Sequence, residues 1–215
     1  MKKYITIISI FFLFTSCESI FYKMYGIKKM DAFNETEYLN SVEKMSIKDS
    51  SVQKTSIISE LENFEAYIKK FSSSLGEKNI KQPIQILYFT KNSLKSFSAN
   101  CYAKGDYFGN LNWNYKGDFD FFIPKSAINI PSTTPSLDNI FKIFKIEKLE
   151  NNDITIVFFW NNMFSKQSKE AFQTISENLY KRKDNVFINL ILINTDIPYI
   201  DFFKTSKKTS NKQMP

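Results

Sequence analysis

Two apolar segments decide the fold: ITIVFFW at residues 154–160 and VFINLILIN at residues 186–194. Both are nearly continuous apolar runs, which is typical of strands that are covered on both faces. Residues 165–180 lie between them and have the period of a helix, with a buried stripe of Ala171, Phe172, Ile175 and Leu179. A strand, a helix and a second strand in this order predict two parallel strands joined by a right-handed crossover, and therefore an α/β fold.

Three amphipathic helices are predicted upstream. The first is short, has Asn34 as its N-cap and carries Tyr38, Leu39, Val42 and Met45. The second ends at Gly76 and has a stripe formed by Ile57, Leu61, Phe64, Ile68, Phe71 and Leu75. Because this stripe lasts less than three heptads, packing on a sheet is favoured over a coiled coil. The third helix follows Ser136 and carries Leu137, Ile140, Phe141, Phe144 and Leu149.

The pattern between these helices predicts strands and a long irregular segment. Residues 84–99 suit a β-hairpin with its turn at Lys91-Asn92-Ser93. Residues 101–135 are rich in Gly, Asn, Asp, Pro and aromatic residues, and we expect only one short strand there, at residues 119–123. Such a long irregular segment in a small domain often carries function.

Residues 1–16 have the pattern of a signal peptide, in which two lysines precede an apolar run over residues 5–14. This run is too short to cross a bilayer as a helix. The sequence Phe-Thr-Ser-Cys at residues 14–17 resembles the lipobox of bacterial lipoproteins, although Phe14 stands where that family has Leu. The resemblance implies that Cys17 carries acyl chains such as palmitate, becomes the first mature residue and holds the protein at a membrane. An ordinary secretory signal or a buried N-terminal helix is the alternative.

The length and charge fit one anchored domain. The chain has 215 residues and a formal net charge of +7, and this length suits a single core. We expect a tether and a short helix over residues 17–48 and one α/β domain over residues 49–215. Removing Lys2 and Lys3 with the signal peptide leaves 27 basic and 22 acidic residues, and after Asp201 there are four lysines and no acid. The body is then nearly neutral, which predicts no nucleic-acid partner.

The junction after the first apolar strand suggests a family. The sequence VFFWNNMFSKQSKE at residues 157–170 resembles the strand-to-helix junction of thioredoxin-like proteins of the periplasmic redoxin type. In that family the strand ends in Phe-Trp, three residues lead to Cys-x-x-Cys, and a basic residue and Glu often follow. The two cysteine positions fall here on Phe164 and Gln167, so both thiols are missing. The sequence ILINTD at residues 191–196 likewise resembles the family's next strand, and the resemblance covers about residues 154–196.

The resemblance implies the fold but not the redox activity. The family continues with a helix, a cis-proline, a β-hairpin and a final helix, whereas only nineteen residues follow Asp196 here. Residues 198–203 suit the start of that helix, and no room remains for the hairpin. Either the hairpin at residues 84–99 completes the sheet, or the fold is a truncated variant. We expect a thioredoxin-like three-layer sandwich, shortened at its C-terminus and extended at its N-terminus by a helical region.

Other catalytic chemistry has little support. The chain contains no histidine, which removes the commonest metal ligand and general base. With Cys17 lipidated, Cys101 has no disulfide partner in the chain, and a lone cysteine beside aromatic residues is most often a small buried hydrophobe. Asp118 and Asp120 would face the same way on a strand, with Asp106 upstream, but no calcium-loop pattern accompanies them. We therefore expect no metal and no cofactor, and a carboxylate-dependent enzyme using these acids is a third interpretation.

Aromatic residues and amides crowd the irregular segment, and this mixture suits a recognition surface. The candidate binding surface consists of Asn112, Trp113, Asn114, Tyr115 and Trp160. The alternative is that the segment covers an otherwise open side of the sheet.

These observations predict a lipid-anchored protein of the bacterial cell envelope, facing the periplasm or the cell surface. We expect its domain to have no catalytic residues and to act as a binding or scaffold module for an envelope protein or a peptide. The rival function is a thiol oxidoreductase that acts through Cys101, alone or with a partner's thiol.

Overall fold

The computed structural model describes residues 26–147, 149, 153–182 and 186–211, with side chains up to residue 205. The expected signal peptide and Cys17 lie outside the described residues, so the lipobox stays a prediction.

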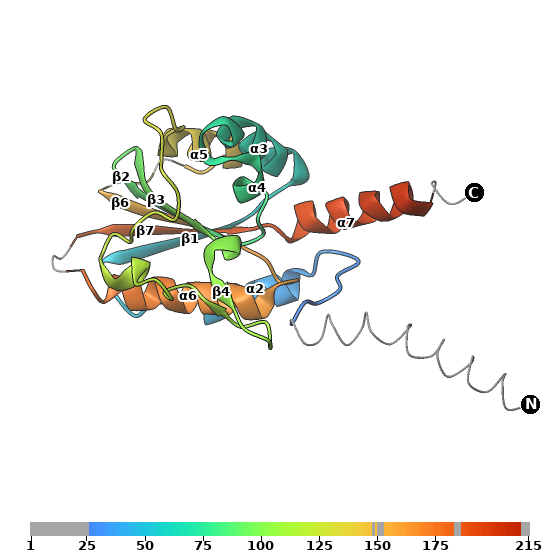
Figure 1. Ribbon diagram of the computed structural model, residues 1–215, viewed down its shortest axis with the longest axis horizontal. Coiled ribbons are helices and arrows are strands. Elements are labelled where there is room, and N and C mark those ends of the chain that lie inside the picture. The colour runs from blue at the N-terminus through green and yellow to red at the C-terminus, as the bar shows by residue number, and fades with distance from the viewer. Residues whose placement is uncertain (1–25, 148, 150–152, 183–185, 212–215) are drawn as a thin grey trace, which may run out of the picture.

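A five-stranded mixed sheet forms the centre of the molecule, in the order β1-β7-β6-β2-β3 (Figure 1). Its strands are β1 (Val52–Ile58), β2 (Gln85–Thr90), β3 (Ser93–Ala99), β6 (Ile154–Trp160) and β7 (Ile188–Asn194). β7 is parallel to both β6 and β1, whereas β2 is antiparallel to both β6 and β3. A separate short ladder joins β4 (Lys104–Gly105) to β5 (Leu111–Asn112).

The predicted strand–helix–strand unit is confirmed. All residues of β6 and β7 are buried, α6 (Ser165–Leu179) connects the two strands, and Ile154 pairs in register with Ile188. A strand buried on both faces needs no polar alternation, which accounts for the continuous apolar runs.

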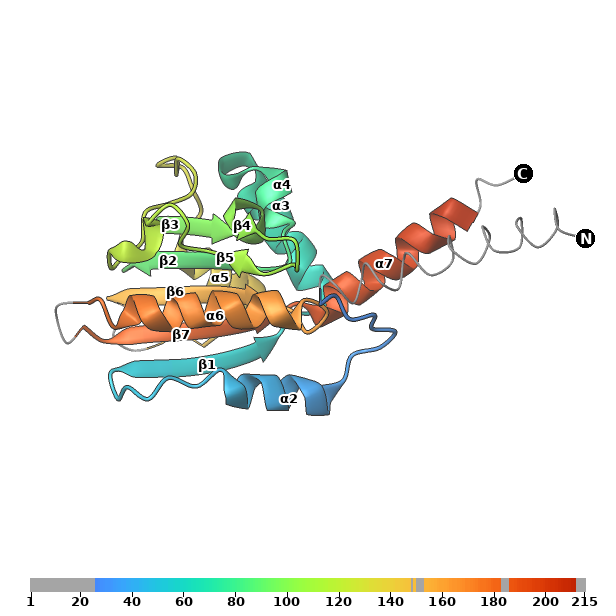
Figure 2. The same cartoon turned by 60° about the horizontal axis from the view of Figure 1, so that its bottom comes forward.

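Helices cover both faces of the sheet and make three layers (Figures 1 and 2). One face carries α3 (Leu61–Leu75), α4 (Glu77–Ile80) and α5 (Leu137–Phe144), and the other carries α2 (Glu35–Lys44) and α6. Side chains alternate along a strand, so β6 supplies Val157 and Phe159 to the core under α3 and α5. Its Ile156, Phe158 and Trp160 enter the core under α2 and α6.

The predicted hairpin is β2 and β3, and it pairs with β6 through β2. This hairpin completes the sheet, as one of the two alternatives predicted, because it occupies the side of β6 away from β7.

The predicted helix ends agree with the structure where a capping residue defines them. Asn34 accepts a hydrogen bond from the Glu37 N–H (3.0 Å), and Ser136 forms a capping box with Asn139 at the start of α5. Gly76 ends α3 with φ +86°, a conformation that only glycine adopts without strain.

Three expectations about local structure are wrong. β1 was not expected, and Ile57 belongs to this edge strand rather than to α3, which begins at Leu61. Residues 119–123 form no strand, because Gly117 in a left-handed conformation leads into the 3₁₀ turn η2 (Asp118–Asp120). Leu149 lies beyond α5, which ends at Phe144.

The C-terminal helix α7 (Asp196–Asn211) includes residues 198–203, as expected. Its first turns pack on the body, because Tyr199 is buried, donates to the Lys81 carbonyl (2.5 Å) and lies 5.7 Å from Phe64 between ring centroids. From Phe203 to Thr205 the side chains are exposed, and the helix projects from the body (Figures 1 and 2).

Candidate functional site

Polar residues gather where the two central parallel strands end. Asn161 and Asn162 follow β6, and Thr195 and Asp196 follow β7. In open α/β sheets, the carboxyl ends of parallel strands are where ligands most often bind. This edge of the sheet is therefore the first place to look for a site.

A buried carboxylate lies at the centre of this edge. Asp196 is fully buried and accepts from the Asn162 N–H (2.6 Å), the Asn162 Nδ2 (2.8 Å) and the Asn194 Nδ2 (3.1 Å). Burial raises the pKa of Asp196, and the nearby Glu37 adds to the effect, while the hydrogen bonds from the two asparagines oppose it. Since all three donors are internal and the carboxylate has no exposed surface, Asp196 shapes the edge rather than meeting a ligand.

A second set of hydrogen bonds fixes the turn from β6 into α6. The Asn161 side chain accepts from the Met163 N–H (2.7 Å), and the Asn161 carbonyl accepts from the Ser168 hydroxyl (2.9 Å). Thr195 donates from its hydroxyl to the Trp160 carbonyl (3.1 Å). Hydrogen bonds to both strands and to the first turns of α6 thus fix the conformation of this turn. The turn forms one wall of the cleft described next.

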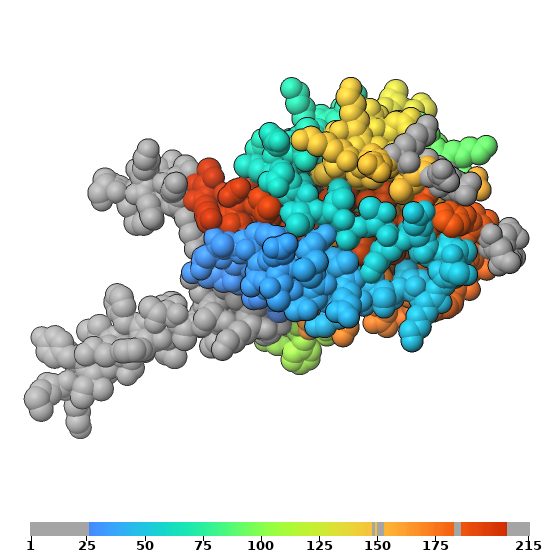
Figure 3. All heavy atoms as spheres, turned by 180° about the vertical axis from the view of Figure 1, so that it is seen from behind, coloured from blue at the N-terminus to red at the C-terminus, as the bar shows by residue number. Residues whose placement is uncertain are grey.

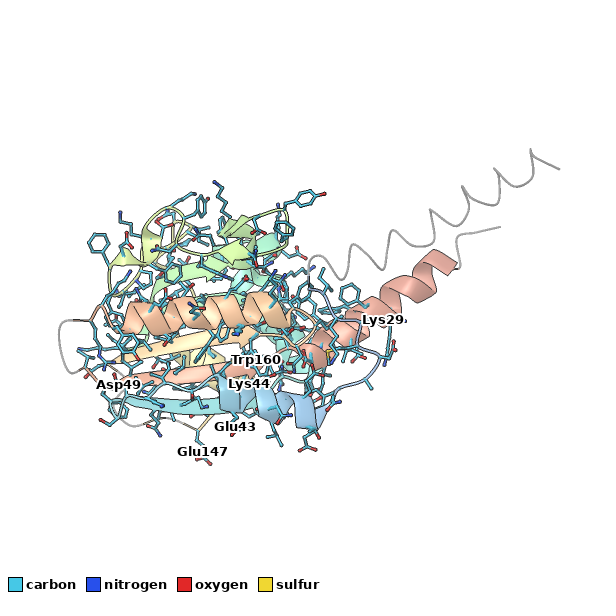
Figure 4. The ribbon with its side chains drawn as sticks, turned by 90° about the horizontal axis from the view of Figure 1, so that it is seen from below. Lys29, Glu43, Lys44, Asp49, Glu147 and Trp160 are labelled. Atoms are coloured by element: carbon cyan, nitrogen blue, oxygen red, sulfur yellow. The ribbon has the colours of Figure 1, made fainter. Side chains whose placement is uncertain are left out.

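A polar cleft of about 400 Å³ opens beside this wall. It is lined by Asn34, Thr36, Glu37, Asn40, Ser41, Lys44, Asn162 and Ser165, and we call it the polar cleft. One side is the outer surface of α2 and the other is the β6–α6 turn, and Ser41 joins them by donating to the Asn162 Oδ1 (2.8 Å). Figure 4 shows Lys44 on α2 and Trp160 at the end of β6.

The charges of the polar cleft are of both signs. Glu37 forms an ion pair with Lys28, whose backbone N–H donates to the Met163 carbonyl (2.7 Å). Lys44 is exposed on the last turn of α2. Amides, hydroxyls, one carboxylate and one ammonium can hydrogen-bond a polar ligand, and the Ser41 hydroxyl is already engaged with Asn162.

The two expected redox positions lie at the start of α6. Phe164 is the N-cap residue and contacts both cores, and Gln167 is buried and donates from Nε2 to the Gly109 carbonyl (3.1 Å). With phenylalanine and glutamine at these positions, the junction cannot carry out thiol–disulfide exchange.

The five residues of the candidate binding surface do not form one exposed surface. Trp113 and Trp160 are 4% and 1% exposed, and Trp160 stacks on Tyr38 of α2 at 5.8 Å between ring centroids. Asn112 and Asn114 are used within the segment itself, since Asn112 accepts from the Asn114 N–H (3.0 Å). Asn114 in turn accepts from the Phe119 N–H (2.7 Å). Of the five candidates, only Tyr115 presents a large exposed ring, beside Lys116.

The irregular segment is instead fastened along α6, which agrees with the alternative that it covers the sheet. Asn178 donates to the carbonyls of Phe119 and Phe121 (2.9 Å each). Glu170 accepts from the Leu111 N–H (2.8 Å), and burial raises the pKa of this carboxyl. Both anchors are polar side chains of a surface helix, and nothing in the spacing of the sequence reveals them.

The three loop acids do not form a site. Asp118 and Asp120 lie in a 3₁₀ turn rather than a strand, so the expectation that they face the same way on a strand is wrong. Hydrogen bonds from Asn114 and Lys181 lower the pKa of Asp120, and those from Asn110 lower the pKa of Asp106. Among the described residues no group of three or more acidic or cysteine side chains could hold a metal ion.

Cys101 is exposed in the 3₁₀ turn η1 (Asn100–Tyr102), so the expected buried position is wrong. The turn directs this residue outward while Tyr102 donates to Asn79 (2.9 Å). Partial burial of the thiol still raises the pKa of Cys101, which leaves less thiolate at neutral pH.

The residues of the polar cleft were missed by the sequence analysis. The sequence signal nearest to the cleft is that polar residues directly follow two apolar strands, as Asn161, Asn162, Thr195 and Asp196 do, and of these four Asn162 lines the cleft. The opposite wall comes from α2, about 120 residues earlier in the chain, and only the tertiary structure brings Ser41 to Asn162.

No helix in the part of the chain that the structure describes has the length and apolar character needed to span a bilayer. Comparison with known proteins gives no match to a family model, to a curated protein or to a solved structure.

Proposed function

We propose that this protein is a lipid-anchored protein of the bacterial cell envelope whose thioredoxin-like domain binds a peptide segment and has no redox activity. The anchor rests on the lipobox resemblance at Cys17. The binding function rests on the polar cleft at the β6–α6 turn.

The sheet supports a thioredoxin-like arrangement in a rearranged chain order. The family places an antiparallel hairpin after its strand–helix–strand unit, and here β2 and β3 occur before that unit but pair on the free side of β6. On this interpretation the hairpin occurs before the strand–helix–strand unit in this chain and after it in the family. The expected C-terminal truncation is then a change in chain order.

The polar cleft is the single observation that carries the function. It lies beside Ser165, at the helix start where the resembling family has its thiols, and offers amide, hydroxyl and charged groups in their place. Such groups pair well with the N–H and C=O groups of an extended peptide. The buried network behind Asn162 keeps this wall fixed, so little ordering entropy is lost when a ligand binds.

The rival oxidoreductase has less support. Cys101 is exposed, but the raised pKa of its thiol disfavours the thiolate that attacks a disulfide. No second cysteine occurs among the described residues to resolve a mixed disulfide.

Binding can be tested by blocking the polar cleft. Asn40 is exposed and lines the cleft, and Leu39 is its exposed neighbour outside the lining. Saturation-transfer NMR with a pool of short, terminally blocked peptides should give signals that Asn40→Trp removes and Leu39→Trp retains. Equal signals from both variants, or none from the wild type, would contradict a peptide site in the cleft.

The anchor needs a separate test. Metabolic labelling with palmitate should mark the wild-type protein and place it in the membrane fraction, and Cys17→Ala should abolish both. Unchanged labelling of Cys17→Ala would show that the lipobox interpretation is wrong.

A further inference from the structure

One edge of the central sheet is open. β1 is the outermost strand, and directly after it the Ser59 N–H donates to the Asn194 carbonyl at the end of β7 (2.9 Å). Because the backbone groups of a strand alternate in direction, the odd-numbered residues of β1 face β7, and those of Lys54, Ser56 and Ile58 point away from it. In the part of the chain that the structure describes, these outward N–H and C=O groups have no hydrogen-bond partner.

The opposite edge of the sheet is covered. At β3 the Phe97 N–H donates to the Ser126 hydroxyl oxygen (3.2 Å), and the Phe97 carbonyl accepts from the Ala127 N–H (2.9 Å). Figure 3 shows β1, in cyan, at the surface between α2, in blue, and the segment that includes α5, in gold. The sheet therefore ends in a covered strand on one side and an uncovered strand on the other.

β1 also lacks the features that keep edge strands from pairing with other chains, namely proline, bulges and projecting charges. Its register with β7 is continuous over its seven residues, and its sequence VQKTSII contains no proline. Its one charged residue is Lys54, whose ammonium donates to the carbonyls of Val42 (2.9 Å) and Met45 (3.0 Å) at the end of α2. This side chain lies along the face of the sheet and leaves the edge unguarded.

The strand is complementary to a second copy of itself. When two β1 strands pair antiparallel about a two-fold axis at Thr55, Lys54 of each copy falls opposite Ser56 of the other. The backbone groups of both residues point outward, so each such pair can exchange both of its hydrogen bonds. Thr55 meets Thr55, a favourable cross-strand pair. No like charges are opposed along the strands, because Lys54 is the only charged residue of β1.

The surface beside this edge is self-complementary as well. α2 ends in Glu43 and Lys44, which are exposed and opposite in charge, and Figure 4 shows Glu43 on the β1 side of the molecule. One turn before Glu43, Leu39 is 57% exposed. An axis perpendicular to the sheet sets the two α2 helices on the same side of the joined sheets, with a carboxylate and an ammonium available from each copy.

We propose that this chain forms a homodimer in which the two β1 strands pair antiparallel about Thr55 and join the two sheets into one. The inference depends on neither the anchor at Cys17 nor the polar cleft, since no residue of β1 lines that cleft.

Disulfide trapping tests both the pairing and its register. The full-length chain is purified in mild detergent with Cys17→Ser and Cys101→Ser, so that no native thiol remains, and one cysteine is added. At the axis, Thr55→Cys sets two Cα atoms about 4.5 Å apart, within the range of a disulfide, whereas Gln53→Cys sets them about 14 Å apart. We expect mild oxidation to convert Thr55→Cys into a covalent dimer and to leave the matched control, Gln53→Cys, monomeric.

The outward hydrogen bonds can be removed without touching those to β7. Ser56→Pro deletes an N–H that points away from β7 and keeps the ladder between the two strands. The two-fold axis makes one substitution remove two hydrogen bonds, so the dimer dissociation constant in sedimentation equilibrium should rise about 30-fold. Ser56→Ala keeps the N–H, and as the matched control it should change the constant by less than about twofold.

The outcomes separate this dimer from other uses of the edge. Thr55→Cys that stays monomeric, or that crosslinks no faster than Gln53→Cys, overturns the pairing, and so do equal dissociation constants for the two folded Ser56 variants. If circular dichroism shows that Ser56→Pro does not fold, the two cysteine variants decide alone. A monomeric chain whose Ser56 amide becomes protected from hydrogen exchange only when an extended peptide is added holds a peptide at this edge, which also overturns the dimer.

Discussion

Removing the buried carboxylate of Asp196 should destabilise the wall of the polar cleft. In Asp196→Ala, the Asn162 N–H, the Asn162 side-chain amide and the Asn194 side-chain amide lose their common acceptor. All three donors are buried, and the backbone N–H cannot turn toward another acceptor.

The magnitude follows from these three donors. An unpaired buried donor costs about 1–3 kcal/mol, and the lower part of this range applies where a side-chain amide can rotate or water can enter. The substitution also removes the cost of burying a charge, which partly offsets the loss. We expect the free energy of unfolding to fall by about 2–4 kcal/mol, a large part of the 5–15 kcal/mol typical of a domain.

Urea denaturation followed by circular dichroism and tryptophan fluorescence measures this change. Asp201→Ala is the matched control, because Asp201 lies on the same helix and its carboxylate accepts no hydrogen bond from the described residues. The control should change the free energy of unfolding by less than about 0.5 kcal/mol. If Asp196→Ala lowers the free energy of unfolding as little as the control does, the hydrogen bonds to Asp196 do not stabilise the wall of the polar cleft.

Further predictions concern pH, the fastening of the irregular segment and the thiol. Burial raises the pKa of Asp196. The contribution of this carboxyl to the free energy of unfolding is therefore fully present below the unfolded-state pKa of about 3.9, and it falls as the pH rises through the folded-state pKa. The decrease in the free energy of unfolding caused by Asp196→Ala should therefore be largest at acidic pH and smaller toward neutral pH. A decrease that grows with pH in urea titrations would refute this prediction. Asn178→Ala breaks three hydrogen bonds, including one from the Tyr88 hydroxyl, and should lower the free energy of unfolding by about 3 kcal/mol. Tyr88→Phe breaks only the hydrogen bond from its own hydroxyl to Asn178 and should lower it by about 1 kcal/mol. Equal decreases for the two variants in calorimetry would contradict the role of Asn178 in fastening the irregular segment. Cys101 should react with Ellman's reagent more slowly than free cysteine at neutral pH, because the raised pKa of its thiol leaves less thiolate, and faster reaction would count against this assignment.

The central unit could be predicted because its strands are buried on both faces. A short, continuous apolar run such as residues 154–160 is typical of a buried strand, and the helix between the two runs has a clear period. β1 was missed because it is an edge strand with polar residues, and Ile57 stands four residues before Leu61, which continues the apparent helical stripe. A spacing of four cannot distinguish the last residues of a strand from the first turn of a helix.

The candidate site was harder to predict, because its walls meet only in the folded chain. Aromatic residues are common both in recognition surfaces and in cores, and the sequence does not distinguish the two. Trp113 and Trp160 were therefore predicted to lie on a surface, whereas the structure buries both. Cys101 shows the opposite error, because neighbouring aromatic residues suggested a core position and a 3₁₀ turn exposes it. The location of Phe164 and Gln167 at the start of the helix, by contrast, was predicted correctly.

An insulin-reduction assay distinguishes a domain that works without thiol chemistry from an oxidoreductase. The wild-type protein and Cys101→Ser should both reduce insulin no faster than the dithiothreitol blank, because the start of α6 carries Phe164 and Gln167 and no thiol. Turnover by the wild type that Cys101→Ser abolishes would contradict the account and make the protein an oxidoreductase.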